Sequence, residues 1–216
     1  MEKLRVTFKK CEGLRYVGHL DILRTFTRAL SRCGFPLKYS EGFNPHPSLV
    51  FNLPTGVGVT SDCEIVDIGF TAPPDTEKFL KDFKACVLPG TIEPISAEIT
   101  DAPMPEIQKA SYSVKIVNDG KISAADFAAA AENPEIIVEK KTKKGMKEVN
   151  IKEYIYELSA ENISESEISV KMTIAAGNTF NLKPSLVISG IARFVKDFRP
   201  LCVLPHREKY FFVTKT

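Results

Sequence analysis

The sequence has no apolar run that approaches the roughly 20 residues needed to span a membrane as a helix. Its first ten residues, MEKLRVTFKK, alternate polar and apolar side chains and lack the hydrophobic region of a signal peptide. The five cysteines are widely spaced, and no pair has the spacing of zinc ligands or of a redox motif. These absences predict a cytoplasmic protein without a membrane contact, whose cysteines are reduced and buried.

The sequence also lacks the motifs of common cofactor sites. Gly56 and Gly58 in LPTGVGV are not followed by the Lys-Ser/Thr pair of a phosphate-binding loop, so a bend in a strand is expected there. The three histidines have no metal-ligand spacing, and few carboxylates lie near them. We therefore expect no metal and no cofactor.

The composition is that of a globular protein with a segregated charge. The 216 residues are 44% hydrophobic and 26% charged, enough for a core without disulfides or metal, in one large or two small domains. The net charge of +2 hides three basic segments, residues 1–50, 139–152 and 193–216, around an acidic stretch at 60–135. Such asymmetry favours a polyanionic partner, although solvated faces without a partner would look the same.

Residues 1–101 predict one α+β domain. Leu4, Val6 and Phe8 alternate with polar residues, as in a half-buried strand. A helix is expected from Leu20 to Gly34, with the apolar stripe Leu20, Leu23, Phe26, Leu30 and Cys33. Further strands are expected at 35–39, 49–53, 63–70 and 92–99, and a second helix at 75–87. The order corresponds to a ferredoxin-like βαββαβ domain, in which two helices cover one face of an antiparallel sheet.

The second half predicts a degenerate ferredoxin-like α+β domain at 111–216, after a proline-containing linker at 102–110. Strands are expected at 112–117, 136–140, 168–174 and 210–213, and helices at 124–132, 151–158 and 184–194. Ser123 is in place to cap the alanine-rich helix, and a lysine-rich turn is expected at 140–147. The proposal of a similar build rests on the order of elements alone.

A row of arginines is the first candidate binding feature. Arg24, Arg28 and Arg32 are four residues apart and would line one face of the first helix, with Arg15 before it and Lys38 after it. Guanidinium groups in a row match successive phosphates, which is why we include all five in a candidate site. The alternative is a solvated face on which Asp21 pairs with a neighbouring arginine.

Two histidines are the second candidate feature. His19 lies at the expected helix start, where it could face an anion or a substrate, and His46 lies between two prolines that restrict the backbone of the loop. Asn44 is presented by the same loop, and Tyr39 could stack on an unpaired base. Alternatively, these residues satisfy or anchor the loops around them.

From Leu14 to Val59, in particular at HLD (19–21) and YSEGFNPHP (39–47), the chain resembles the radical-SAM-linked proteins, with a weaker continuation at NLKPSLVI (181–188). This is a bacterial family of unknown function, encoded beside or fused to a radical-SAM enzyme with a cobalamin-binding-type domain. The resemblance implies such an enzyme as a partner and assigns no catalytic residue. The chain has no CxxxCxxC motif, so it does not hold the iron–sulfur cluster itself.

Three functions are compatible with these patterns. The first is a non-catalytic accessory protein that presents a structured RNA, such as tRNA or rRNA, to the radical-SAM enzyme. The second is a metal-independent endoribonuclease similar to the CRISPR repeat-processing enzymes, with His19 or His46 and Tyr39 in acid–base roles. The glycine-rich C-terminal loop of those enzymes is missing here. The third is a subunit that binds only the radical-SAM protein.

Overall fold

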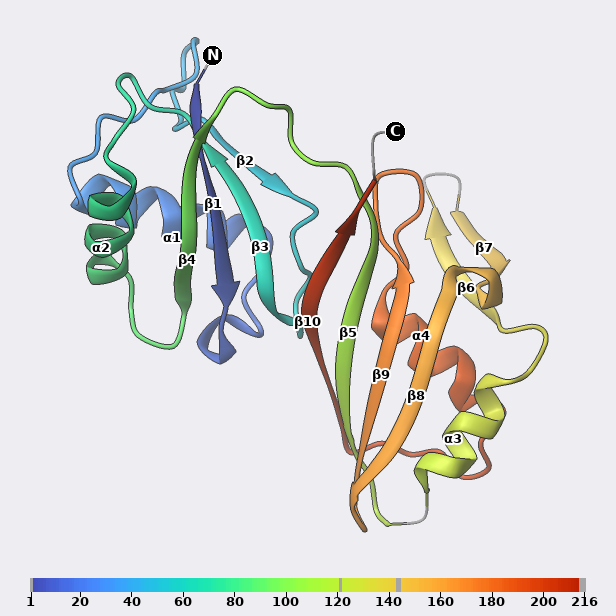
Figure 1. Cartoon of the computed structure of the whole chain (residues 1–216). Helices are drawn as coiled ribbons and strands as arrows, with labels where there is room; N and C mark the ends of the chain where they lie inside the picture. Colours follow the sequence, from blue (N-terminus) through green and yellow to red (C-terminus); the bar gives the residue numbers. More distant parts are fainter. Residues whose placement is uncertain (1, 121, 143–144, 214–216) are drawn as a thin grey trace. The chain divides into compact units, whose positions relative to one another are not determined.

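The computed structural model describes residues 2–120, 122–142 and 145–213. The chain divides into two compact units, unit 1 (Met1–Glu106) and unit 2 (Ile107–Thr216). Each unit combines antiparallel strands with α-helices, and the described residues form four α-helices (Figure 1). The prediction of a mixed α+β protein is therefore confirmed.

Unit 1 has its elements in the order strand, helix, strand, strand, helix, strand. They are β1 (Lys3–Lys10), a 3-10 turn (Glu12–Leu14), α1 (His19–Arg32), β2 (Leu49–Asn52), β3 (Thr60–Ile68), α2 (Thr76–Cys86) and β4 (Ile92–Thr100). The strands lie in the order β4-β1-β3-β2, and every neighbouring pair is antiparallel. Both helices pack on one face of this sheet, where they share a core with β1 and β3.

The core of unit 1 follows the alternation of β1 and a stripe of α1 that differs in part from the predicted one. Leu4, Val6 and Phe8 are buried, as the period of two requires. On α1 the buried residues are Ile22, Phe26, Ala29 and Leu30. Leu20, predicted to face inward, is 68% exposed. The helix begins at His19, one residue before the expected start, and the contacts of Phe26 with Phe8 on β1 and Phe51 on β2 determine its buried face. Leu20 therefore lies on the solvent side.

The predicted strand at residues 35–39 is wrong. Only two isolated bridges form there, Leu37 with Phe70 and Tyr39 with Pro47. Gly34, with a φ of +71°, ends α1 in a left-handed turn, and the prolines at 36 and 47 cannot donate to a ladder. The segment is therefore the base of a loop and not a sheet strand.

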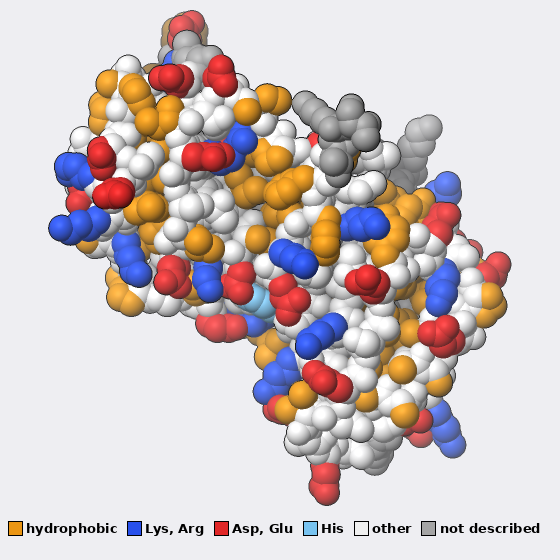
Figure 2. All heavy atoms as spheres, viewed as in Figure 1, with side chains coloured by type: hydrophobic (Ala, Val, Ile, Leu, Met, Phe, Trp, Pro, Cys, Tyr) orange, Lys and Arg blue, Asp and Glu red, His pale blue; other side chains and the backbone are white. Residues whose placement is uncertain are grey.

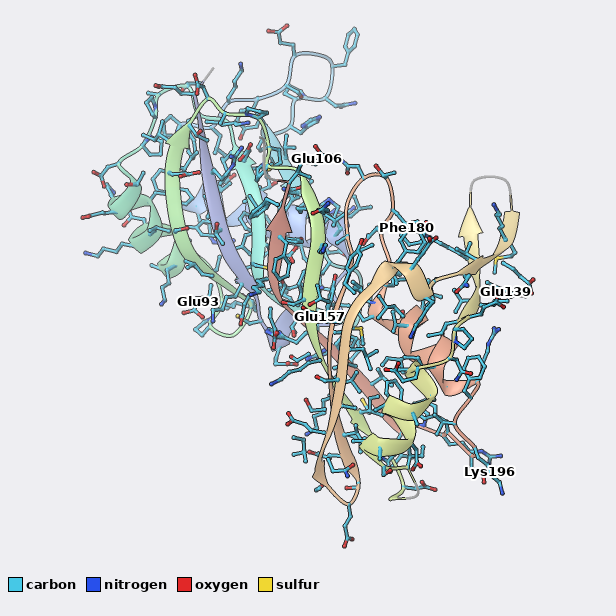
Figure 3. The ribbon with its side chains drawn as sticks, turned by 45° about the vertical axis from the view of Figure 1, so that its right-hand side comes forward. Glu93, Glu106, Glu139, Glu157, Phe180 and Lys196 are labelled. Atoms are coloured by element: carbon cyan, nitrogen blue, oxygen red, sulfur yellow. The ribbon has the colours of Figure 1, made fainter. Side chains whose placement is uncertain are left out.

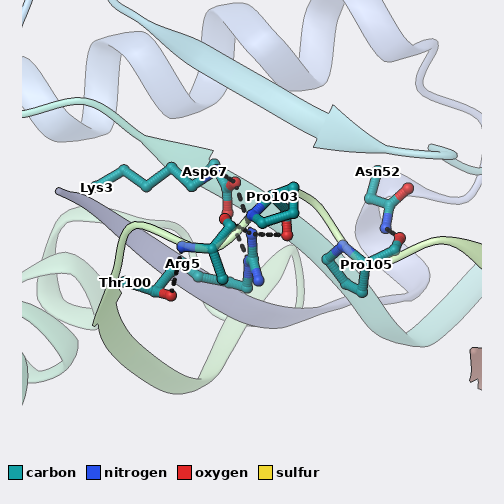
Figure 4. A network of polar contacts seen from close by, with 8 residues as sticks. Lys3, Arg5, Asn52, Asp67, Thr100, Pro103 and Pro105 are labelled. Carbon is teal, nitrogen blue, oxygen red and sulfur yellow. Dashed lines mark hydrogen bonds and ion pairs between the residues drawn. The ribbon is translucent and has the colours of Figure 1, made fainter. Parts of the chain in front are cut away.

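An ion network fixes the end of unit 1 (Figure 4). Asp67 on β3 accepts hydrogen bonds from the Nε and Nη2 atoms of Arg5 at 2.8 and 3.0 Å, and Lys3 Nζ lies 2.7 Å from its Oδ2. Arg5 also donates to the carbonyl oxygens of residues 102 and 103, and Asn52 Nδ2 donates to Pro105 O at 2.8 Å. Residues 101–105 are thus tied to the sheet. Residues 107–110, predicted as linker, instead begin strand β5, where Ile107 is buried.

We expect Asp67→Asn to destabilise unit 1 by about 2 kcal/mol at neutral pH, because two cations would lose their carboxylate. Burial of Asp67 disfavours its charged form, but the bonds and charges of Arg5 and Lys3 outweigh burial and lower its pKa. The advantage of the wild type is therefore full above the pKa of an unfolded aspartate, about 3.9, and is lost as the pH falls through the lower pKa of the folded state. Urea unfolding at several pH values measures it.

Glu93→Gln is the matched control for this prediction, because Glu93 forms an exposed pair with Lys84 at 3.7 Å. Exposed pairs of this kind contribute about 0–1 kcal/mol, so a small effect is expected. Equal effects of the two substitutions at neutral pH would contradict a special role of Asp67.

Unit 2 repeats the order of unit 1 with an extra hairpin. Its elements are β5 (Ile107–Val117), α3 (Ala124–Ala131), β6 (Ile137–Thr142), β7 (Gly145–Asn150), a 3-10 turn (Lys152–Tyr154), β8 (Ile155–Ser164), β9 (Glu167–Ala175), α4 (Pro184–Ala192) and β10 (Cys202–Phe212). Within the unit the strands run β10-β5-β9-β8, again antiparallel, and β6 and β7 pair only with each other. The tip of the predicted lysine-rich turn, residues 143–144, lies outside the described residues.

In unit 2 the capping signal predicted the start of α3 correctly, whereas two other elements differ from the prediction. Ser123 caps α3 in a capping box with Asp126, as its hydroxyl accepts from the Asp126 amide and the Asp126 carboxylate accepts from Ser123. The predicted helix at 151–158 is wrong, because a single 3-10 turn there leads into β8. The last strand is much longer than the predicted 210–213 and includes Pro205.

Candidate functional site

The start of α1 carries His19 as its first residue, preceded by Gly18 at the N-cap position. The extended backbone of Gly18 (φ −76°, ψ 161°) follows the 3-10 turn at 12–14, and Asp21 complements the helix dipole in the first turn. The His19 ring stands edge-on to Phe51 of β2, with ring centroids 5.1 Å apart. Its Nδ1 atom is buried, and no described residue forms a hydrogen bond to it. His19 is thus half-buried against the core.

The loop at residues 53–59 is fixed beside this helix start. The Gly58 amide donates to Arg15 O at 2.7 Å, and the Arg15 Nη1 atom donates to Gly58 O at 3.0 Å. Lys10 Nζ donates to Gly56 O at 3.0 Å. Gly58 has a φ of +86°, and it lies with Gly56 in the turn between β2 and β3, so the expected strand bend or bulge is not found there. A side chain at Gly18 would touch Val57, so loop and helix are in close contact.

Arg15 is part of these contacts between the loop and the helix start and not of an open binding surface. It is 6% exposed and forms two bonds with the Glu12 carboxylate, at 2.5 and 2.8 Å. Its guanidinium is engaged by the Glu12 carboxylate and the Gly58 carbonyl, and separating such a buried pair would leave an uncompensated charge. We therefore remove Arg15 from the set of residues that could reach a ligand.

The three arginines of the row differ in their contacts: Arg24 and Arg28 face solvent, whereas Arg32 bonds to the end of α2. Arg24 and Arg28 are exposed on α1, and Arg24 pairs with Asp21 at 2.8 Å, one of the two alternatives considered from the spacing. Arg28 forms no ion pair with the described residues. Arg32 Nη2 donates to Cys86 O at 2.5 Å and so satisfies the C-terminal end of α2. Two of the three arginines remain on one solvent-facing stripe, together with Leu20.

The loop at residues 40–47 projects from unit 1 as an exposed turn. The Ser40 amide donates to His46 O at 2.9 Å, and the His46 amide donates to Ser40 Oγ at 3.1 Å. Phe43 is fully exposed, Asn44 and His46 are exposed, and Tyr39 at the base is 47% exposed. Lys38 is half-buried where its backbone bonds to Gly69 and Ser48. The loop is held at its base and presents its tip to solvent.

The two histidines do not converge. His19 contacts Phe51 near the end of β2, whereas His46 precedes the start of β2. Five extended residues separate Phe51 from His46, about 16 Å along the strand. His19 and His46 therefore belong to two clusters, one at the helix start and one in the loop at residues 40–47. Tyr39 and His46 do share one loop.

Exposed apolar residues at the helix start were missed by the sequence patterns. Tyr16, Leu20 and Val57 are 70%, 68% and 63% exposed. Leu20 fits a helical apolar stripe, and Val57 lies in an apolar context, so neither carries a signal of exposure. The one signal in the sequence is that this region has more apolar residues than its core has buried positions, so that some of them must be exposed.

The cysteines are free but only half-buried, so the prediction of buried thiols is wrong in degree. Burial, and then a hydrogen bond with Cys86, raise the pKa of Cys33 to about 12. A thiol with so high a pKa is protonated at neutral pH and is a poor nucleophile. This makes Cys33 unsuitable for covalent catalysis.

Two kinds of feature are absent from residues 2–120, 122–142 and 145–213. No helix in them is both long and apolar enough to cross a membrane. Nor do any three of their His, Cys, Asp and Glu side chains come together as metal ligands.

Comparisons with known proteins place the chain in a family. No curated protein matches it. A solved structure of an unknown protein from Galdieria sulphuraria is 12% identical and covers 99% of both chains, with a TM-score of 0.28. A "putative glycine cleavage system transcriptional repressor" is 10% identical, over 100% of this chain and 99% of its own, with a TM-score of 0.26. TM-scores this low carry no information about function. Residues 3–184 match the model of a family described as "uncharacterized protein conserved in bacteria" (DUF2344), and the chain belongs to this family.

Proposed function

We propose that the protein is a non-catalytic accessory of a radical-SAM enzyme with a cobalamin-binding-type domain, and that it binds structured RNA for modification. The resemblance at Leu14–Val59 supports the enzyme partner, since the sequence itself has no CxxxCxxC motif for the cluster. The role assigned to this chain is to bind and position the RNA, and the chemistry belongs to the partner.

The solvent-facing stripe of α1 is the observation that best supports RNA binding. Arg24 and Arg28 lie one turn apart on it, and Asp21 is the only carboxylate that pairs with either among the described residues. A polyanion would compete for Arg24 and would find Arg28 available. Guanidinium groups spaced in this way bind neighbouring phosphates and make affinity depend on salt.

We also propose that each unit is a ferredoxin-like domain. The orders β4-β1-β3-β2 and β10-β5-β9-β8 support this, because both correspond to the same path of a βαββαβ chain. In unit 2 the hairpin β6–β7 is inserted after the first helix. Many RNA-binding modules use a sheet of this size as a rigid frame for basic and aromatic side chains.

The test is a gel shift with total tRNA and rRNA fragments. The wild type is expected to bind at low salt and to be released as salt rises. Arg24→Glu with Arg28→Glu should weaken binding about tenfold or more, since two attractive contacts become repulsive. Lys81→Glu with Lys84→Glu on exposed positions of α2 makes the same change in charge and should have a smaller effect. No binding by the wild type at low salt would refute the proposal.

The same samples separate the two alternatives. Tyr39 and His46 share one loop, which is the observation that favours a nuclease. On a denaturing gel we expect intact RNA; cleavage by the wild type that His46→Ala abolishes would replace our proposal with the nuclease. Co-purification of the radical-SAM protein with a wild type that binds no RNA would favour a pure protein-interaction subunit.

A further inference from the structure

In the β6–β7 hairpin, Lys140 and Lys147 lie on one face, and Glu139 and Glu148 lie on the other. In its register Lys140 lies opposite Lys147, and Glu139 lies opposite Glu148. Alternation along β6 puts Lys140 on the same face as Val138, which is buried against α4 at Gly190. The two lysines therefore share the face that turns toward α4, and the two glutamates share the other. Like charges directly opposite each other are destabilising, so this arrangement has a cost in the isolated protein.

Packing, and not a carboxylate, holds Lys140 in place. Its Nζ atom donates to Asn181 O at 3.2 Å and lies 3.7 Å from the centroid of the Phe180 ring. Phe180 is labelled in Figure 3. The Tyr154 ring stacks on Phe180 at 3.7 Å, with an interplanar angle of 14°. Both faces of Phe180 are therefore occupied. The Lys140 ammonium is fixed before any ligand arrives.

A third lysine adds to the same charge. Lys183 is the N-cap residue of α4, two residues after Asn181. Burial, and then the positive charge of Lys183, lower the pKa of Lys140. Within the described residues, none of Lys140, Lys147 and Lys183 forms an ion pair.

The sheet of unit 2 mixes the two charges, because Glu157, Glu161, Glu167 and Glu208 lie on the same set of strands as Lys109, Lys115, Lys171 and Lys209. There Lys115 pairs with Glu167 at 2.7 Å, and Glu157 accepts a bond from Thr173 at 2.9 Å. Figure 2 shows basic and acidic side chains intermixed over the visible face of unit 2. Lysines interleaved with glutamates in this way produce a weaker positive field than lysines alone. The group of Lys140, Lys147 and Lys183, which we call the lysine face, has no carboxylate paired with it among the described residues.

We infer that the lysine face is a second RNA-binding surface, in unit 2, that contacts backbone phosphates; the inference rests on the proposed function. Three ammonium groups run from β7 across β6 to the start of α4, so they suit an extended polyanion better than a small anion. Because Tyr154 and Lys140 occupy both faces of Phe180, that ring offers no surface for a base. The contact is therefore made to phosphates and is independent of sequence.

The test compares two triple variants by fluorescence anisotropy with labelled tRNA at several salt concentrations. The first changes Lys140, Lys147 and Lys183 to Gln, and the second changes the exposed Lys171, Lys196 and Lys209 of the same unit to Gln. We expect the first to bind about tenfold or more weakly at low salt, with the slope of log K against log salt reduced by about two. The control should retain the slope of the wild type.

Each outcome bears on a different statement. Wild type that binds no RNA refutes the proposed function and this inference together. Wild type that binds, with both triple variants unchanged or equally weakened, refutes the lysine face and leaves the proposed function standing. If the first triple variant unfolds, Lys147→Gln with Lys183→Gln replaces it, because both side chains are exposed; a slope reduced by at least one is then expected, and an unchanged slope overturns the inference.

Discussion

Phe26→Ala is expected to destabilise unit 1 by about 3–5 kcal/mol, the cost of removing a fully buried aromatic side chain from a packed core. Phe26 has no exposed surface and lies on α1 between three other rings. Its ring centroid is 4.8 Å from that of Phe8 on β1, 5.3 Å from that of Phe51 on β2 and 5.1 Å from that of Phe83 on α2. The substitution therefore leaves a cavity where four elements meet.

Guanidinium unfolding followed by circular dichroism measures this effect. Leu20→Ala is the matched control in the same helix, because Leu20 is mostly exposed and its loss should change stability by less than about 0.5 kcal/mol. Phe26→Ala should also disturb the start of α1, since Phe51 contacts both Phe26 and His19. A loss of less than 1 kcal/mol would show that the neighbouring rings close the cavity, contrary to our expectation.

Gly177→Ala is expected to destabilise unit 2 by about 2–4 kcal/mol. A Cβ atom at this position would lie 2.5 Å from the carbonyl oxygen of Ile107, which is backbone and cannot rotate away. The φ of +154° adds strain for any residue other than glycine. Either the loop after β9 or the start of β5 must move to relieve the clash.

The displacement should also reach the lysine face, because the loop after Gly177 carries Phe180, Asn181 and Lys183. We therefore expect lower stability together with a weaker dependence of RNA affinity on salt. Gly56→Ala is the control, because no atom lies within 4 Å of its added Cβ and its backbone is ordinary. A Gly177→Ala protein with the stability of the wild type would contradict the contact with Ile107.

Much of the fold was predictable because its signals are local. The alternation of Leu4, Val6 and Phe8 placed β1 and its buried face. Asp75 caps α2 by accepting a bond from the Lys78 amide, and Ser123 caps α3, each just before an apolar helical pattern. Capping and periodicity act within one turn or one strand, so they are visible without the partner element.

The errors arose where a distant partner decides. Residues 155–158, predicted as the end of a short helix, begin strand β8 because β9 pairs with them. Residues 35–39 have no such partner apart from single bridges, and remain a loop. Leu20 faces solvent because the contact with the sheet chooses which face of α1 is buried.

For the site, residue spacing was enough to predict that arginines line one face of α1, that lysines gather near residues 140–147, and that His46 lies in a proline-restricted loop. Which of these residues face solvent depends on packing between distant parts of the chain. Arg15 forms an ion pair with Glu12, and Arg32 donates a hydrogen bond to the carbonyl oxygen of Cys86 at the end of α2. Lys140 and Lys183, in contrast, lie close together and neither forms an ion pair with a described carboxylate. The reason is physical: spacing sets the face of a helix or strand, but the charge that a ligand meets depends on which residues, remote in the chain, have already paired.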